Sequence, residues 1–262
     1  MIDPKIIFSL AIIGHNEKKH LHFLLPDVIN WADEIIYVDC ESEDQSYEYA
    51  KSLGCKVFRR PNNTNLNVNK TYAINQCHGK WILYLDPDER LTQELKNELK
   101  DKISSSATSD SAFFIKRKNH YFSKWLKYGS QYPDLQLRLF KKDKAKFAKK
   151  HVHEKLEVEG STGKLKESML HFNFLDVSHF LKKFDFYTSV EASYLFKAGV
   201  RINFINSFKY FVIKPFVRFI KRYFLKLGFL DGIPGLFCAL FDALNFIVRY
   251  FKLWELSVKD KK

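Results

Sequence analysis

Two carboxylates stand one residue apart at the end of an apolar run in the first half of the chain. Residues 81–86 read Trp-Ile-Leu-Tyr-Leu-Asp, and Pro87, Asp88 and Glu89 follow them. This composition predicts a buried strand, and parallel sheets bind ligands at the carboxyl ends of their strands. There, Asp86 and Asp88 can hold Mg²⁺ or Mn²⁺ together with the diphosphate of a nucleotide. The alternative is a solvated acidic turn, with Glu89 favouring the start of a helix.

Further polar residues follow two other predicted strands. Asp39 closes the run 34–39, and Asn16 and Glu17 come after the run 6–13. Because the carboxyl ends of parallel strands meet at one edge of a sheet, we expect these residues to converge with the Asp86 cluster. A carboxylate at Asp39 can accept a hydrogen bond from the imide N–H of uracil. The alternative for Asp39 is a helix-capping acid in a strand-to-helix loop.

The elements that must position these residues alternate between strands and helices. Four β-rich runs are separated by segments of helical periodicity, and the runs cover residues 6–13, 34–39, 56–59 and 81–86. This alternation predicts an α/β fold built from βαβ units, with a mixed but mostly parallel sheet flanked by helices. Later extended runs are short and irregular, which indicates a mixed second half of the same sheet; they cover residues 112–116, 137–140, 155–158 and 165–172.

Composition limits the class of protein. The chain has 262 residues, of which 46% are hydrophobic and 28% charged, so it can build a core and is not a disordered protein. The net charge of +13 predicts an acidic partner. The four cysteines stand at wide spacings, which fits a reducing cytosol rather than a disulfide framework. No run reaches the ~18 apolar residues of a membrane-spanning helix.

The last third of the chain predicts amphipathic helices. A helix from residue 177 is expected, with Asp176 as N-cap and Gly199 at its C-terminal end. Residues 207–230 then carry six cations and no acid, interleaved with aromatic residues, and Pro215 is expected to begin a new helical piece. Residues 236–254 form a further apolar helix with one polar stripe. This pattern is typical of helices that lie in the interface of an anionic membrane.

Two alternatives compete for this tail. It can be a helical layer packed on the preceding domain, or a nucleic-acid surface, since lysines and aromatic residues also bind single strands. The tail lacks sheet-based stacking motifs and a helix-turn-helix signature, so we expect no nucleic-acid partner. Nothing in the sequence predicts an oligomeric state.

Several motifs together resemble glycosyltransferase family 2, which has the GT-A fold. The residues that carry this likeness are 9–17, 37–39 with Asp44, and 85–89. Four further segments are similar to the lipopolysaccharide-core glucosyltransferases of that family, namely 132–140, 151–154, 170–172 and 223–232. The likeness covers nearly the whole chain. It implies an enzyme that transfers a sugar from a nucleotide-sugar donor.

The resemblance implies a role for individual residues of the donor site. Asp39 would contact the nucleobase, Asp86 the ribose and metal, and Asp88 would be the principal metal ligand. Lys70 or Arg138 would face phosphate. Related sequences usually show Ser-Gly-Ser-Thr-Asp where this chain has Cys-Glu-Ser-Glu-Asp at residues 40–44. Since glycine readily adopts a positive φ, Glu41 puts the details of the nucleobase contact in question.

The resemblance also implies a general base for inversion. Asp134 is the first candidate and Glu154 the rival, while Arg138 would stabilise the departing phosphate. The alternatives are a turn residue at Asp134 and a structural ion pair at Arg138. His153 would complete the metal shell or touch the diphosphate, with His171 as a weaker candidate. His151 and His153 would place two imidazoles on one face of a strand, but a zinc site is not expected, because no further Cys or His ligands stand near this pair.

These expectations combine into one hypothesis. Residues 1–175 would form the GT-A catalytic domain and residues 176–262 a helical membrane-association region. The protein would transfer a hexose, glucose, from UDP-glucose to a lipid-linked saccharide, the heptose of the lipopolysaccharide inner core. It would act as a peripheral protein on the cytoplasmic side of the bacterial inner membrane. The alternatives are transfer to a polyprenyl phosphate or a capsule precursor, and a non-catalytic membrane-binding module.

Overall fold

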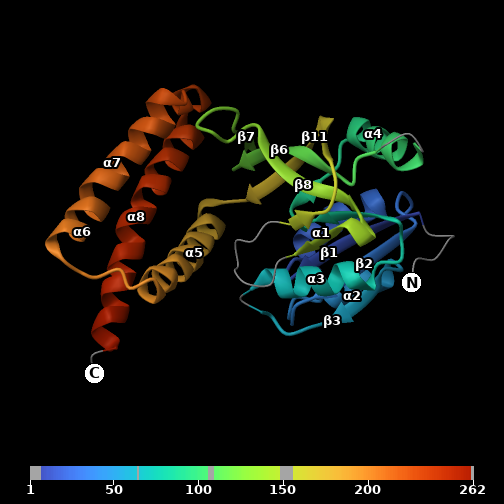
Figure 1. The fold of residues 1–262 in the computed structure, drawn as a ribbon, viewed down its shortest axis with the longest axis horizontal. Helices are drawn as coiled ribbons and strands as arrows, with labels where there is room; N and C mark the ends of the chain where they lie inside the picture. The colour runs from blue at the N-terminus through green and yellow to red at the C-terminus, as the bar shows by residue number, and fades with distance from the viewer. Residues whose placement is uncertain (1–6, 64, 106–108, 148–155, 261–262) are drawn as a thin grey trace. The chain divides into compact units, whose positions relative to one another are not determined.

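Four parallel strands form one half of a mixed sheet, as the alternation predicted. The computed structural model describes residues 7–63, 65–105, 109–147 and 156–260 (Figure 1). The parallel strands lie in the order β3-β2-β1-β4, with bounds β1 (Phe8–Gly14), β2 (Glu34–Asp39), β3 (Lys56–Arg59) and β4 (Trp81–Leu85). All four predicted β-rich runs are therefore confirmed as strands.

The sheet continues beyond β4 with strands β8, β6, β11 and β5. β4 pairs antiparallel with β8, and β11 pairs antiparallel with β5. The bounds are β5 (Glu89–Arg90), β6 (Ala112–Tyr121), β7 (Lys124–Trp125), β8 (Asp134–Lys141), β9 (Ala145–Phe147), β10 (Leu156–Val158) and β11 (Thr162–Phe174). β7 pairs with β6, and β9 and β10 form a separate two-stranded sheet. The mixed second half is confirmed, with β6 and β11 longer than predicted.

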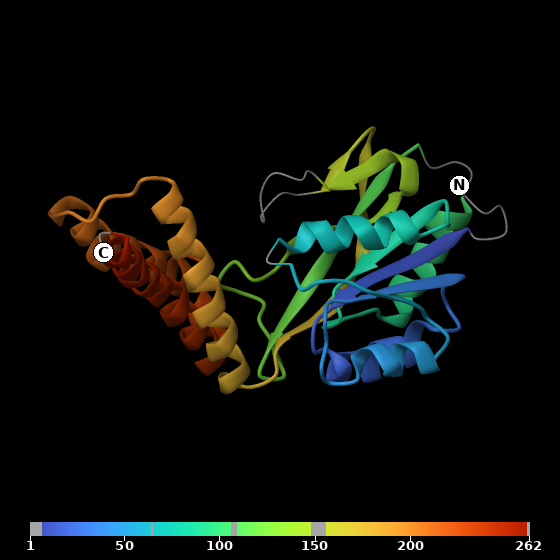
Figure 2. The same ribbon diagram turned by 90° about the horizontal axis from the view of Figure 1, so that it is seen from below.

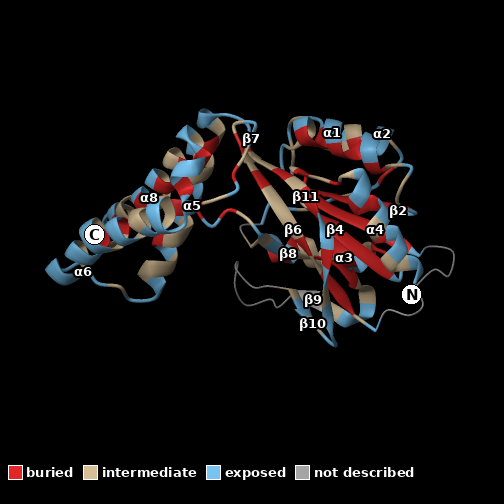
Figure 3. Cartoon of the chain, turned by 90° about the horizontal axis from the view of Figure 1, so that it is seen from above, coloured by how far each residue is buried: buried red, intermediate tan, exposed pale blue. Residues whose placement is uncertain are grey.

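Helices cover both faces of the parallel strands (Figure 2). α1 (Lys18–Val28), α2 (Ser46–Ser52) and α4 (Gln93–Ser104) pack on one face, and α3 (Leu66–Gln76) packs on the other. Each face of the sheet has its own hydrophobic core, and alternate strand residues point into one or the other. Leu10 and Ile12 face α1, whereas Ala11 and Ile13 face α3. Buried residues therefore run almost continuously along β1, β2 and β4 (Figure 3). Such runs are typical of a sheet covered on both faces.

The chain divides into two compact units. The first comprises Met1–Arg117 and Leu135–His171, and the second comprises Lys118–Asp134 and Phe172–Lys262. The second unit thus holds the segment 118–134 as well as the C-terminal helices. The predicted roles, catalytic up to residue 175 and membrane association after it, stay predictions.

Three long helical stretches build the C-terminal part of the second unit. α5 (Val177–Lys197) begins where predicted, because the Asp176 carboxylate accepts from His179 N at 2.7 Å. Gly199, at φ +70°, follows its end. The stretch 204–225 comprises α6 (Phe204–Phe208), a π-helix η2 (Lys209–Ile213), α7 (Lys214–Phe219) and a second π-helix η3 (Ile220–Leu225). A short turn η4 (Gly228–Asp231) leads into α8 (Ile233–Lys259).

Pro215 stands in the first turn of α7, as predicted, yet the backbone stays helical through Ile213 and Lys214. Proline has no N–H to donate to the preceding turn, and in this chain the wider π-turn η2 stands just before it. α6 and α7 are therefore parts of one helical stretch, which lies against α8 (Figure 1).

The polar side chains of the α8 stripe form ion pairs with other helices of the second unit. Asp242 lies 2.6 Å from Arg222 Nε, and Arg249 pairs with Glu191 of α5 at 2.5 Å. Lys252 pairs with Asp185 of α5 at 2.7 Å. These ion pairs tie α8 to both neighbouring helical stretches. Within the described ranges, none of the helices combines the length and apolarity that crossing a bilayer requires.

Candidate functional site

The polar clusters that follow β1, β2 and β4 meet at one edge of the sheet. The strand register pairs Gly14 with Asp39 across β1 and β2, and Ile12 with Leu85 across β1 and β4. Since these strands are parallel, the residues after each one leave the sheet on the same side. The predicted convergence is therefore confirmed in the first unit.

Asn16 joins the first two of these loops. Its backbone adopts a positive φ of 57°, and its N–H donates to Ser42 Oγ at 2.8 Å. Its side-chain oxygen accepts from Glu43 N at 2.8 Å. Glu17 N donates to Ser46 Oγ at 3.0 Å. These bonds shape the edge on which a ligand would lie, and the predicted ligand contacts of Asn16 and Glu17 stay predictions.

Glu41 occupies the position where the resemblance implies a glycine, and its backbone conformation is the one that glycine favours. Its φ is +55°, and its carboxylate accepts from Asn62 N at 3.0 Å. A non-glycine residue there costs about 1 kcal/mol or more. The hydrogen bond to Asn62 helps to hold the turn. The loop after β2 thus has the backbone conformation of a glycine turn, with the Glu41 side chain in addition.

Asp39 has one carboxylate oxygen that accepts a hydrogen bond and one that has no partner among the described residues. The residue is fully buried, and Oδ2 accepts from Ser42 N at 3.1 Å with Arg59 Nε at 3.6 Å. Oδ1 is also buried, and it has no hydrogen bond among the residues that the structure describes. A buried polar atom without a partner is rare and costly. An acceptor of this kind at the ligand edge suits a donor group from a bound nucleobase.

Asp86 is held as an anion by its neighbours. Its carboxylate accepts from Tyr84 Oη at 2.7 Å and from Arg138 Nη2, and Lys70 Nζ lies 3.9 Å away. Burial alone would raise the pKa of Asp86, but the charges of Arg138 and Lys70 outweigh it and hold this pKa below its usual range. Burial lowers the pKa of Lys70. Asp86 is thus a charged part of the protein framework as well as a ligand candidate.

Glu89 is a site residue that the sequence interpretation missed. It is fully buried at the start of β5, where it accepts from Asp86 N at 3.0 Å and from Arg138 Nη2 at 2.6 Å. Arg117 Nη1 lies 3.3 Å from the same carboxylate. Burial tends to lower the pKa of Arg138, and Asp86 and Glu89 raise it above its usual range. Glu89 therefore fixes the turn after β4 instead of starting a helix.

Asp88 and His171 stand beside this cluster. Nε2 of His171 lies 3.4 Å from Oδ2 of Asp88, and β11 brings His171 opposite Glu89. Among the described residues, no group of three or more His, Cys, Asp or Glu side chains is arranged to hold a metal. A Mg²⁺ or Mn²⁺ ion often takes only one or two carboxylates and completes its shell with phosphate oxygens and water. Asp88, with His171 beside it, fits that donor set.

The remaining candidates are His153, Glu154, Asp134 and Arg138. His153 and Glu154 fall outside the described residues. Asp134 is the first residue of β8 and belongs to the second unit, where its Oδ2 accepts from Asn119 Nδ2 at 3.2 Å. Its role as base stays a prediction. Arg138, whose guanidinium engages two carboxylates, has the ion-pair role that was its alternative, and its predicted phosphate contact is untested.

Comparisons with known proteins identify the family. Residues 9–156, more than half of the chain, match the family described as glycosyl transferase family 2. An uncharacterized glycosyltransferase of Rickettsia typhi is 28% identical over 264 residues, which cover 97% of this chain and 88% of that protein. The lipopolysaccharide core biosynthesis glycosyltransferase LpsC of Rhizobium meliloti is 24% identical over 262 residues, with 96% and 93% covered. The chain belongs to glycosyltransferase family 2.

The α/β architecture is the GT-A type that the sequence predicted. Among solved structures, S. aureus TarS in complex with UDP is similar, with 14% identity and a TM-score of 0.48; the match covers 95% of this chain and 88% of that one.

Proposed function

We propose that this glycosyltransferase moves glucose from UDP-glucose, with inversion, to a lipid-linked saccharide, the heptose of a lipopolysaccharide inner core. One observation supports the assignment of the sugar donor: the acceptor oxygen of Asp39 and the carboxylates of Asp86 and Asp88 stand at the carboxyl ends of β2 and β4, the two parallel strands that flank β1. The acceptor assignment is supported by the similarity to a lipopolysaccharide core glycosyltransferase over nearly the whole chain.

The donor-side roles follow from the chemistry of the edge. Oδ1 of Asp39 would accept from the imide N–H of uracil, since no hydrogen-bond donor reaches this buried oxygen from the residues that the structure describes. Asp86 would face the ribose while Arg138 and Lys70 keep it ionised. Asp88, beside His171, would hold a divalent cation, which when bound neutralises charge on the departing diphosphate. Lys70 would contribute a further positive charge near the phosphates.

Inversion requires attack on the face of the sugar opposite the diphosphate. The acceptor hydroxyl oxygen forms the new bond to the anomeric carbon, the bond from that carbon to the diphosphate oxygen breaks, and UDP leaves with the electron pair. Asp134 would take the proton of the hydroxyl, with Glu154 as the rival base. Asn119 donates to Asp134 Oδ2 at 3.2 Å, which orients this carboxylate.

The second unit would hold the enzyme on the cytoplasmic side of an anionic inner membrane. Along residues 204–233 many apolar side chains are exposed, including Phe204 (85%), Ile205, Phe208, Val212, Phe216, Leu225 and Ile233. Lys209 and Lys221 are exposed among them. By contrast, Arg218 and Arg222 pair with Asp242. A face of aromatic and aliphatic side chains with interspersed lysines suits the interface of anionic lipid.

A donor and acceptor screen tests this function. The purified protein is supplied with UDP-glucose, UDP-galactose or UDP-N-acetylglucosamine in the presence of Mn²⁺. The acceptors are heptose-terminated lipopolysaccharide core and polyprenyl phosphate, each in vesicles. We expect glucose on the heptose in the β configuration, since inversion of the α-linked donor requires it. Transfer to polyprenyl phosphate alone would replace the acceptor assignment, and an α-linked product would exclude the inverting mechanism.

A further inference from the structure

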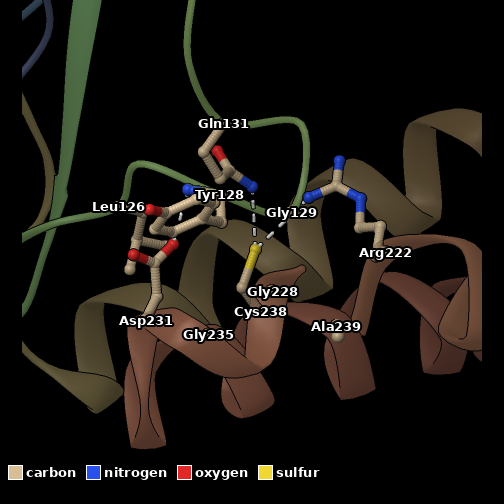
Figure 4. A pocket seen from close by; sticks show the side chains of 10 residues that line it. All are labelled: Leu126, Tyr128, Gly129, Gln131, Arg222, Gly228, Asp231, Gly235, Cys238 and Ala239. Carbon is tan, nitrogen blue, oxygen red and sulfur yellow. Dashed lines mark hydrogen bonds between the residues drawn. The ribbon is translucent and has the colours of Figure 1, made fainter. Parts of the chain in front are cut away.

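The segment 124–134, which ends at the candidate base Asp134, is fastened to the turn η4 and the first turns of α8. Both parts belong to the second unit. Figure 4 shows the contact, with Asp231 beside the loop that carries Tyr128 and with Gln131 pointing at Cys238. The two parts are about one hundred residues apart in the sequence, so this contact is a specific feature of the fold.

Asp231 caps the loop with its carboxylate. Oδ1 accepts from Lys127 N at 3.2 Å and Oδ2 accepts from Tyr128 N at 2.8 Å, while the backbone oxygen of Asp231 accepts from Lys124 Nζ at 2.6 Å. The residue is only 4% exposed. A buried carboxylate that accepts two backbone N–H groups is a strong, directional anchor, and removing it leaves those donors unsatisfied.

Glycines stand where the loop meets η4 and where η3, η4 and α8 pack against one another. Gly129 N donates to Lys226 O at 2.8 Å, and a Cβ at Gly129 would lie 3.6 Å from the Cα of Gly228. A Cβ at Gly228 would come within 2.7 Å of Arg222 O, and one at Gly235 would collide with Gly228 O. Larger residues at Gly228 or Gly235 would therefore shift η4, which carries Asp231, relative to η3 and α8.

A short hydrogen-bonded path leads from this anchor to Asp134. Gln131 N donates to Tyr128 O at 3.0 Å, and Gln131 Nε2 donates to Cys238 Sγ at 2.9 Å. The buried Asn119 on β6 then donates from one amide group to both Gln131 O, at 3.1 Å, and Asp134 Oδ2, at 3.2 Å. The base candidate and the capped loop thus share one donor.

We propose that Asp231 and Asn119 are positioning residues for Asp134, with Asp231 fixing the loop and Asn119 fixing the carboxylate. The inference rests on the role proposed above for Asp134. The run Gly-Phe-Leu-Asp-Gly at residues 228–232, which contains Asp231, would then position the base although it lies far along the chain from the donor site. Misplacing a base by about 1 Å lowers the chemical step by up to ~100-fold and leaves donor binding unchanged.

A double-mutant cycle tests the proposal. Asp231→Asn, Asp134→Asn and the double variant are assayed with UDP-glucose and vesicles carrying heptose-terminated core. Asp176→Asn is the matched control, because Asp176 also accepts from a backbone N–H, that of His179 at 2.7 Å, in the same unit. Far-UV circular dichroism and thermal unfolding check folding. Should Asp231→Asn fail to fold, Asn119→Ala enters the cycle in its place.

We expect Asp231→Asn to lower kcat about 10- to 100-fold with the KM for UDP-glucose unchanged. The same change in the Asp134→Asn background should cost less than about twofold, since a residue that acts through Asp134 has nothing left to position. The control should keep kcat. Equal losses in both backgrounds, or a wild-type kcat in Asp231→Asn, would overturn the positioning role alone. A wild-type kcat in Asp134→Asn would remove the base assignment and this inference together.

Discussion

Arg138 joins Asp86 to Glu89 across the turn that follows β4. One nitrogen, Nη2, donates to both carboxylates, and Tyr84 and Lys70 complete the cluster around Asp86. Asp86 and Glu89 are three residues apart, so this single guanidinium fixes the conformation of the segment that presents Asp88. The conformation of the turn after β4, at the sheet edge where the sugar donor is proposed to bind, therefore depends on a charge from another strand, β8.

Arg138→Lys should lower both stability and nucleotide binding. An ammonium is a single point of charge on a flexible stem and does not reproduce the fork of a guanidinium. We expect a loss of about 1–3 kcal/mol in the free energy of unfolding and weaker binding of UDP, measured by urea titration and calorimetry. Arg249→Lys is the control, since Arg249 pairs with Glu191 at 2.5 Å in the second unit. Unchanged UDP affinity in Arg138→Lys would show that the donor edge does not need this bridge.

Asp39→Asn should change the choice of nucleobase. Uracil presents an imide N–H to an acceptor, whereas cytosine presents a lone pair at the same ring position. An amide at residue 39 offers donors as well as an acceptor, so we expect UDP to bind about tenfold or more weakly and CDP to lose less. Calorimetric titration with UDP and CDP measures the ratio. An unchanged preference for UDP would move the base contact away from Asp39.

Glu34 makes the first unit sensitive to acid. Burial opposes its charge, but hydrogen bonds from Lys56, Ser9 and His78 outweigh burial and lower the pKa of Glu34 from 4.5 to about 2. A depressed folded-state pKa contributes stability above about pH 4.5 that is lost as the pH falls toward 2. The lowering corresponds to roughly 3 kcal/mol at neutral pH.

Glu34→Gln should therefore cost most at pH 7 and progressively less as the pH falls below 4.5. Urea unfolding of both proteins across this range gives the difference in free energy. Glu167→Gln, at an exposed position on β11, is the control and should show no such pH dependence. If the free energies of unfolding of wild type and Glu34→Gln differed by a constant amount down to pH 3, Glu34 would not have a lowered pKa in the folded protein.

Membrane binding should depend on the exposed lysines of the stretch 204–225. Lys209→Gln with Lys221→Gln removes two charges that each contribute about 1 kcal/mol near an anionic surface. Flotation with phosphatidylglycerol vesicles should fall about 10- to 30-fold in affinity and depend less on salt. The exposed pair Lys51→Gln and Lys100→Gln is the matched control. Equal flotation of the two double variants would argue against an interfacial role for this face.

The sequence predicted the strands well and the contacts of charged side chains less well. β2 and β3 were located to the residue, because apolar runs between turn signals mark buried strands. The buried role of Glu89 was missed, since its partners Arg138 and Arg117 come from distant strands. The polar stripe of α8 was likewise visible as a pattern, but its partners, such as Glu191 on α5, depend on how the helices pack. Local patterns show which side chains are charged, and only the fold shows what neutralises them.

The most direct test of the central claim is transfer of labelled glucose from UDP-glucose to vesicle-borne core by wild type and by Asp88→Asn. Wild-type transfer should require Mg²⁺ or Mn²⁺, and Asp88→Asn should lose about 100-fold or more in rate, because an amide is a poor ligand for these cations. Asp88→Asn should also lose the strengthening of UDP binding by Mn²⁺ while unfolding at the wild-type temperature. Transfer by Asp88→Asn at the wild-type rate would contradict the proposed donor site.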